Sequence, residues 1–153
     1  MTQKGVKPDE VTLLCMLLGY NHSGLVEEGK RIFESMRLHG VFPDRRHYSY
    51  MIDLLGRAGQ VIEAEELLNQ ASSTGDSVMW SSLLQSCRIH QTKHVGRRAA
   101  TKLMDLELED LSVWLQALNF YSEIGEFETA IYIREVALAR KMSGDIALYS
   151  HVP

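Results

Sequence analysis

Four aspartates recur along this chain at nearly regular intervals, each directly before a run of helix-periodic apolar residues. They are Asp9, Asp44, Asp76 and Asp110. A carboxylate at such a place accepts hydrogen bonds from the free backbone N–H groups of the first helical turn, and its charge complements the positive end of the helix dipole. The residues by themselves therefore indicate four helix N-caps.

The histidines and cysteines do not form a catalytic or metal-binding pattern. His90 and His94 are four residues apart, as in some zinc sites on a helix, but we expect a turn at Gln91 to separate their faces. Cys15 and Cys87 each lie in an apolar helical stretch, which indicates core positions in a reducing compartment and excludes a disulfide framework. We therefore predict no catalytic residue, no metal and no cofactor, so the chain is not expected to be an enzyme.

An internal repeat supplies the elements that position these residues. Residues 1–9 match residues 36–44 at five of nine positions, with an offset of 35 that also carries Gly24 onto Gly59. Such a period is typical of solenoids built from stacked units. Offsets of 35, 32 and 34 give a truncated repeat at 1–9, units at 10–44, 45–76, 77–110 and 111–144, and a tail at 145–153. On this division Met1 falls inside a repeat, so we expect the first unit to be cut.

Each unit contains two apolar stripes with helical spacing, separated by a turn. The first stripe of the first unit is Leu13, Met16, Leu17 and Tyr20, and the second stripe of the fourth unit is Phe127, Ala130, Ile133 and Ala137. We expect the turns at Gly24, Gly59, Gln91 and Gly125. One position of the second stripe is always small, which would let helices cross closely: Gly29, Ala64, Gly96 and Ala130. The pattern predicts an all-α chain of about four helical hairpins.

Composition restricts the possible partners. A net charge of -4 and a pI near 5.8 argue against a free-standing nucleic-acid binder, so any RNA contact should be local. No run of 18 apolar residues is present, which argues against a membrane span, and the first residues do not resemble a targeting segment. We expect any targeting sequence of a parent protein to lie upstream.

Several stretches resemble a known family. Residues 5–12, 22–29 and 47–59 are similar to plant pentatricopeptide repeat (PPR) proteins, and residues 79–90 resemble the start of the extension (E) domain in their PLS-type editing-factor subclass. The resemblance implies a right-handed superhelical α-solenoid of helix-turn-helix repeats. It also implies a long-type repeat at 10–44, a short-type repeat at 45–76, and two extension motifs at 77–110 and 111–144.

The resemblance further implies residues that contact RNA. In this family each repeat reads one base with a residue near the start of its first helix and the last residue of the unit. The matching positions are Leu14 with Asp44, and Ser49 with Asp76. Serine with aspartate implies a guanine preference, whereas Leu14 offers no hydrogen bond. Asp76 then has two alternative roles, as a helix cap or as a base-reading carboxylate.

The extension motifs are not expected to read bases, although Ser81 with Asp110, and Leu115, occupy the equivalent positions. The third unit is locally basic, through Arg88, Lys93, Arg97, Arg98 and Lys102. These side chains either meet phosphate or an acidic partner, or form a solvated helix face. Trp80 and Trp114 begin apolar stripes and are interpreted as core anchors, with base stacking at an exposed edge as the alternative.

The resulting hypothesis is the C-terminal part of an organellar PPR protein, in a mitochondrion or chloroplast, that binds single-stranded RNA and recruits the C-to-U editing machinery. No histidine is followed two residues later by glutamate and no Cys-x-x-Cys is present, so a cytidine deaminase would act in trans, with or without accessory proteins. The alternative is a protein-protein adaptor without RNA binding. The cut first repeat, near Leu13, Leu17 and Ile32, is expected to self-associate or to dock onto the rest of the protein.

Overall fold

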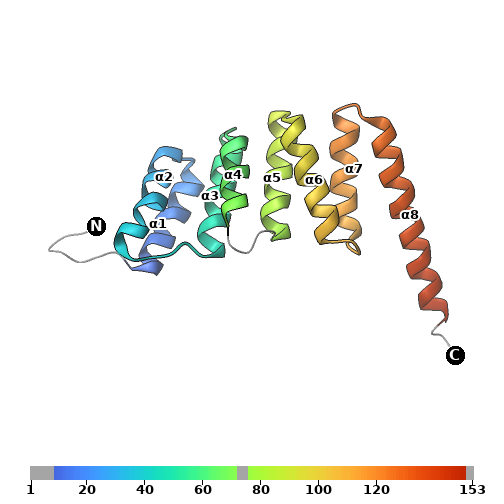
Figure 1. The fold of residues 1–153 in the computed structure, drawn as a ribbon, viewed down its shortest axis with the longest axis horizontal. Helices are drawn as coiled ribbons and strands as arrows, with labels where there is room; N and C mark the ends of the chain where they lie inside the picture. The colour runs from blue at the N-terminus through green and yellow to red at the C-terminus, as the bar shows by residue number, and fades with distance from the viewer. Residues whose placement is uncertain (1–8, 72–75, 151–153) are drawn as a thin grey trace.

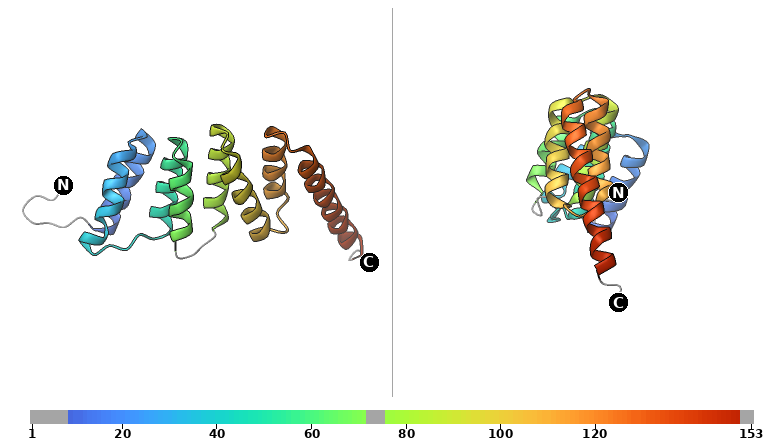
Figure 2. Two further views of the ribbon diagram at one scale, coloured as in Figure 1. Left: turned by 45° about the horizontal axis from the view of Figure 1, so that its top comes forward. Right: turned by 90° about the vertical axis from the view of Figure 1, so that its right-hand side faces the viewer.

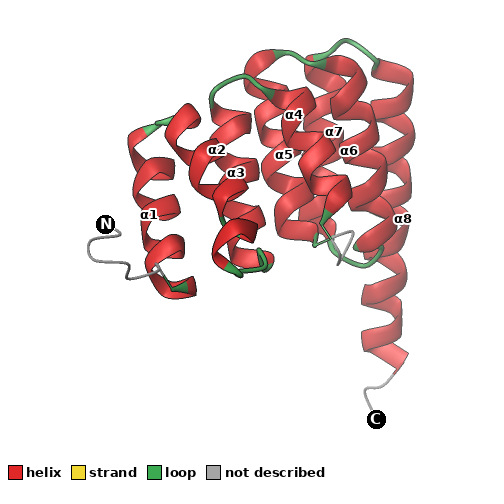
Figure 3. Ribbon diagram, turned by 60° about the vertical axis from the view of Figure 1, so that its left-hand side comes forward, coloured by secondary structure: helices red, strands yellow, loops and turns green. Residues whose placement is uncertain are grey.

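The chain folds into a single row of antiparallel helix pairs (Figure 1). The computed structural model describes residues 9–71 and 76–150, with side chains up to residue 141, and all regular structure in these ranges is helical (Figure 3). The pairs are α1 (Glu10–Ser23) with α2 (Val26–Ser35), α3 (Arg45–Arg57) with α4 (Val61–Gln70), α5 (Ser77–His90) with α6 (Lys93–Leu106), and α7 (Leu111–Glu123) with α8 (Phe127–Ser150). A short 3-10 helix, η2 (Arg37–His39), follows α2. The predicted all-α solenoid of four helical hairpins is confirmed.

The four recurring aspartates cap the first helix of each pair, as predicted. Each side chain accepts a hydrogen bond from a backbone N–H of the first turn. The bonds run from Thr12 to Asp9 (2.7 Å), from Arg46 to Asp44 (2.9 Å), from Val78 to Asp76 (2.8 Å) and from Ser112 to Asp110 (2.9 Å). Capping therefore fixes the start of every unit.

The turn inside each pair has a left-handed residue where the sequence predicts it. Gly24, Gly59 and Gly125 have φ values of 70°, 86° and 83°, and Gln91 takes the same conformation at 55°. A residue other than glycine pays a steric penalty there. The turn at Gln91 also puts His90 on α5 and His94 on α6, so the two imidazoles lie on different helices.

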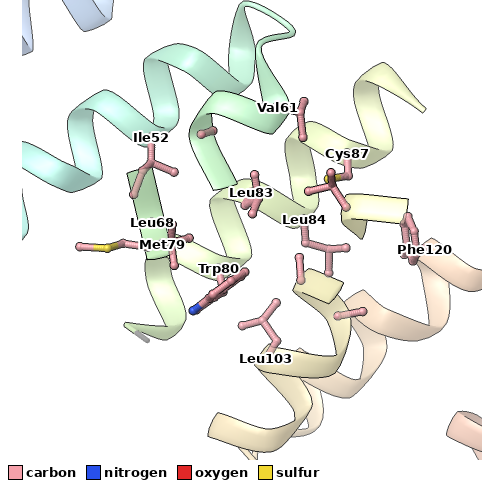
Figure 4. Close-up of a cluster of buried hydrophobic side chains, with 14 of the residues drawn as sticks. Ile52, Val61, Leu68, Met79, Trp80, Leu83, Leu84, Cys87, Leu103 and Phe120 are labelled. Carbon is pink, nitrogen blue, oxygen red and sulfur yellow. The ribbon is translucent and has the colours of Figure 1, made fainter. Parts of the chain in front are cut away.

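A single apolar core runs along the row of pairs. Trp80 and Trp114 are 3% and 7% exposed and belong to this core, which confirms their interpretation as anchors. Figure 4 shows the Trp80 indole beside Leu68 of α4 and Leu103 of α6. Trp80 lies in the first turn of α5, which is the first helix of the third pair. Its contact with Leu68 therefore joins the third pair to the second. None of the described helices is both long and apolar enough to cross a membrane.

The glycines at the small position of the second helix lie at the junction with the following unit. A Cβ on Gly29 would come within 2.6 Å of Leu54 on α3, and one on Gly96 would overlap the ring of Phe120 on α7. Ala64 and Ala130 are buried at the equivalent positions. The predicted close crossing is confirmed at Gly29 and Gly96, where it also joins successive hairpins.

Two expectations drawn from the apolar stripes are wrong. Cys15 is exposed, because the apolar residues of α1 surround the helix and hide which face is buried. Phe127 is 64% exposed, because it is the first residue of α8. Leu13 and Leu17 are buried, as their stripe predicts, because α1 packs onto α2 and α3. The helix α8 continues to Ser150, through part of the range 145–153 that the sequence assigns to a tail.

Candidate nucleic-acid interface

An ion pair connects the helix that carries the predicted Ser49 to the predicted Asp76. Ser49 lies in the second turn of α3 and is half-buried, whereas Asp76 caps α5. Arg45 links them, because it lies one helical turn before Ser49 and its Nε donates to Asp76 Oδ2. The ion pair therefore holds the carboxylate beside the face of α3 that carries the hydroxyl.

Asp76 is an ionised and largely covered carboxylate. Its Oδ1 accepts from the Val78 N–H at 2.8 Å, its Oδ2 accepts from Arg45, and its side chain is 14% exposed. The hydrogen bond from Arg45 is the main reason that the pKa of Asp76 lies below its ordinary value. A carboxylate has about four lone-pair sites, so two acceptor sites remain beyond these bonds. Capping therefore leaves room for a second interaction.

Leu14 and Asp44, the second predicted pair, lie on different helices and differ in polarity. Leu14 is half-buried on α1, and Asp44 forms a capping box with His47 at the start of α3. The Arg46 guanidinium also donates to Asp44 Oδ2 at 2.9 Å. Burial alone would raise the pKa of Asp44, but the hydrogen bonds from Arg46 and from the His47 backbone hold it well below its ordinary value. This carboxylate too is ionised.

Two functional candidates, Arg45 and Arg46, were missed by the sequence interpretation. Each binds one of the aspartates that end a unit: Arg45 binds Asp76, and Arg46 binds Asp44. Their position was itself a signal, because cations at a helix N-terminus oppose the helix dipole and need a compensating partner. The two aspartates supply that partner in this structure.

Three of the basic side chains predicted for phosphate or a partner are engaged in ion pairs between units. Arg88 binds Glu123 at 2.5 Å, Arg97 binds Glu126, and Arg98 binds the buried Glu65 through two bonds of 2.8 and 2.6 Å. They are therefore not free cations on a solvated face. Lys102 and Lys93 are exposed, and no ion pair involves them within the described side chains. The proposed phosphate role now depends mainly on these two lysines.

A hollow of about 470 Å³ lies between α4 and α6, where part of this basic group is found. It is lined by both charge signs and by the Trp80 ring, through Glu65, Asn69, Trp80, Arg97, Arg98, Thr101, Lys102 and Asp105. Mixed charge does not favour a phosphate over any other polar ligand. Among the described side chains, no three histidine, cysteine, aspartate or glutamate residues are placed to hold one metal ion.

Stacked antiparallel helix pairs that repeat along the chain define a helical-repeat protein. Residues 11–41 and 46–74 match the PPR repeat, and this part of the chain belongs to the PPR repeat family. Ser49 lies within the second match. Asp44 and Asp76 lie just beyond the two matched ranges, where each unit ends.

The homologues of this chain are plant PPR-containing proteins. A putative pentatricopeptide repeat-containing protein of Arabidopsis thaliana is 38% identical over 146 residues, which cover 94% of this chain and 17% of the relative. A second, named as mitochondrial, is 38% identical over 137 residues, covering 89% of this chain and 20% of its own length. A third is 34% identical over 152 residues, covering 97% and 29%. The chain thus spans less than a third of the length of these curated relatives.

Proposed function

We propose that this chain is part of an organellar RNA-binding PPR protein, and that its first two units contribute to the recognition of single-stranded RNA. Ser49 and Asp76 would read one base, and Leu14 with Asp44 would face a second base with little discrimination. The observation that carries the proposal is the ionised Asp76, held beside the Ser49 face of α3 by Arg45. A carboxylate accepts from the N–H donors of guanine, and a serine hydroxyl donates or accepts.

The last two units would form an extension domain of the PLS-type subclass that recruits the C-to-U editing machinery. The deaminase would be supplied in trans, because the chain lacks the histidine, glutamate and cysteine pattern that such a zinc enzyme needs. We assign the protein to a mitochondrion or chloroplast by its family, and one relative carries the word mitochondrial in its name. Lys102 and Lys93 would contact phosphate or the recruited partner.

The base-reading proposal is tested by replacing the carboxylate without removing the helix cap. Asp76→Asn keeps an N-cap, because asparagine and aspartate cap almost equally well. It also adds an N–H donor where guanine requires an acceptor. Affinity is measured for four RNAs that differ at a single nucleotide within a uniform pyrimidine background.

We expect the original chain to prefer guanine and Asp76→Asn to lose that preference by roughly tenfold, the discrimination of one good base contact. Ser81→Ala is the matched control, since it occupies the equivalent position in the third unit and should leave the preference unchanged. Equal affinity of the original chain for all four RNAs would show that Asp76 acts only as a cap.

The alternative function is a protein-protein adaptor without direct RNA binding. The observation in its favour is the pairing of Arg88, Arg97 and Arg98 with glutamates, which leaves few free cations on the third unit of an acidic chain. The salt dependence of RNA affinity separates the two functions. Contacts to phosphate release counterions, so RNA affinity falls steeply with salt, whereas docking of a protein on this chain does not require such a release. A steep fall in affinity with rising salt supports RNA binding, and undetectable RNA binding at low salt supports the adaptor.

A further inference from the structure

We infer that the outer face of α7 and α8 binds an amphipathic helix of a protein partner, whose apolar stripe is flanked by carboxylates. The inference rests on the recruiting role proposed above for the last two units, and it specifies the chemistry of the recruited segment. The site is a groove of about 310 Å³ lined almost entirely by carbon. Its lining residues are Leu111, Leu115 and Leu118 from α7, with Arg134, Ala137, Leu138 and Lys141 from α8.

Two of the groove's leucines occupy positions that are polar in the second and third units. Leu115 occupies the position of Ser49 and Ser81 and is 54% exposed. Leu111 occupies the position of Arg45, at the start of the unit, and is also exposed. Exposed leucines at these positions favour binding of a partner, because burying each leucine side chain removes its apolar surface from water.

Another repeat of the same kind would not fit this face well. In the first three units the residue four positions after the small residue packs against the following unit, and it is apolar: Phe33, Leu68 and Ala100. Phe33, for example, makes an edge-to-face contact with Tyr48 at 5.3 Å between ring centroids. The fourth unit has Arg134 there. A docking repeat would have to bury this guanidinium, which is unfavourable unless it is paired.

Charge complementarity therefore identifies the occupant. Among the side chains that the structure describes, Arg134 and Lys141 are both exposed, they line the groove with five apolar residues, and no carboxylate lines it. A helix with apolar residues at positions i, i+3 or i+4, and i+7 would fill the groove, and flanking glutamates or aspartates would pair with the two cations. A second copy in a symmetric dimer is disfavoured, because two identical faces would bring cation against cation.

The groove lies between two neighbouring helices, because its lining residues come from α7 and α8 only. These helices are antiparallel neighbours at the C-terminal end of the row (Figure 2). A partner helix can therefore lie between them with two or three side chains inserted.

Selection from a displayed library of 16-residue peptides tests the inference with the full chain. The bait is the original chain, with Leu115→Ser as the counter-selection bait, because units two and three already carry serine there. Arg134→Ala, which copies Ala100, tests the charge, and Leu38→Ser changes an even more exposed leucine on η2 as the control. Dissociation constants of the selected peptides are then measured by fluorescence anisotropy, and the oligomeric state by light scattering.

We expect selected peptides with a helical apolar stripe and an excess of aspartate and glutamate over lysine and arginine. Leu115→Ser should weaken their binding at least tenfold, Arg134→Ala by about fivefold, and Leu38→Ser not at all. Absence of Leu115-dependent peptides, a basic consensus, or dimerisation that Leu115→Ser abolishes would each overturn the inference. If the original chain binds the selected peptides but does not bind RNA, only the RNA function is refuted, because the groove lies away from Ser49 and Asp76.

Discussion

The two halves of this molecule join their hairpins in different ways. In the first half, the leading helices α1, α3 and α5 pack directly on one another, whereas α5 and α7 touch at few points. Beyond α5, the preceding hairpin holds the fourth hairpin mainly through α6, with Phe120 against Gly96 and the Arg97–Glu126 ion pair. The leading helices are thus closely coupled from α1 to α5, and the coupling weakens at the junction between the third and fourth hairpins.

A polar network explains the tight coupling of the first half. Asn21 is buried and donates from Nδ2 to the Tyr50 carbonyl at 2.8 Å and to Asp53 Oδ2 at 3.1 Å. Arg57 donates to the Asn21 backbone and side-chain oxygens at 2.6 and 2.8 Å, and Ser82 of α5 donates to Asp53. Reading one base per repeat needs a constant spacing between leading helices. If the proposed base reading holds, the network would provide that spacing, and the fourth hairpin would not need it for docking a protein.

The largest effect should come from the aromatic contact that holds the second half together. Phe120→Ala is expected to lower the free energy of unfolding by about 3–5 kcal/mol, because it removes a fully buried ring and leaves a cavity beside Gly96. Phe127→Ala, at an exposed phenylalanine seven residues later, should change it by less than about 0.5 kcal/mol. Urea unfolding measures both, and similar losses would refute the packing described for α6 and α7.

The polar network of the first half should respond to a smaller change. Asn21→Ala is expected to lower the free energy of unfolding by about 1–3 kcal/mol, because it removes the side-chain hydrogen bonds of Asn21 to the Tyr50 carbonyl and to Arg57. Asn119→Ala, at an exposed site on α7, is the matched control and should have no measurable effect. In the Asn21→Ala variant, backbone amide hydrogens of α1 and α3 should also exchange faster than in the original chain, whereas those of α7 should not. Equal stability of the two variants would mean that the network does not couple the leading helices.

The small residues at the junctions provide the next comparison between the halves. Gly96→Ala is expected to lower the free energy of unfolding by about 1–2 kcal/mol, because the new methyl group overlaps an aromatic ring that cannot move aside easily. Gly29→Ala should be nearly neutral, since it meets only the end of the flexible Leu54 side chain and gains about 1 kcal/mol of helix propensity. Thermal unfolding of the two variants decides the matter. A larger loss for Gly29→Ala would reverse the proposed difference.

The sequence predicts most of the fold because its signals are local. The four aspartate caps, the turns at Gly24 and Gln91 and the small residue at Gly96 each depend on a few neighbouring residues, and all lie where they were expected. The exposure of Cys15 was not predictable in this way. Leucine, valine and methionine surround it on α1, so periodicity alone cannot tell which face meets α2 and α3.

The candidate site was predictable only in part, because its partners are distant in sequence. Ser49 and Asp76 follow from the repeat, but the ion pair of Arg45 with Asp76 spans 31 residues, and that of Arg98 with Glu65 spans 33. No local pattern specifies which carboxylate meets which cation. The apolar groove of α7 and α8 was missed for a similar reason, since Leu111 and Leu115 become notable only when compared with the polar residues of other units.

The smallest effect, and one common to both halves, is the dependence of stability on pH. Hydrogen bonds from Arg45 to Asp76, and from Arg88 to Glu123, lower the pKa of each carboxyl in the folded state. Such groups stabilise the fold fully above their unfolded pKa of about 4, and this contribution is lost as the pH falls through the lower folded value. The urea midpoint should therefore stay nearly constant from pH 7 to 5 and fall below about pH 4. A midpoint that already falls between pH 7 and 5 would contradict this assignment.

The most direct test of the division between the halves is ultraviolet crosslinking of the whole chain to single-stranded RNA, followed by mass spectrometry of the crosslinked peptides. The account predicts crosslinks in peptides that contain the start of α3, with Arg45 and Ser49, and the start of α5, with Asp76. It predicts none in α7 and α8, where the apolar groove lies. Crosslinks concentrated in α7 and α8, or a pattern spread evenly over all four hairpins, would contradict it.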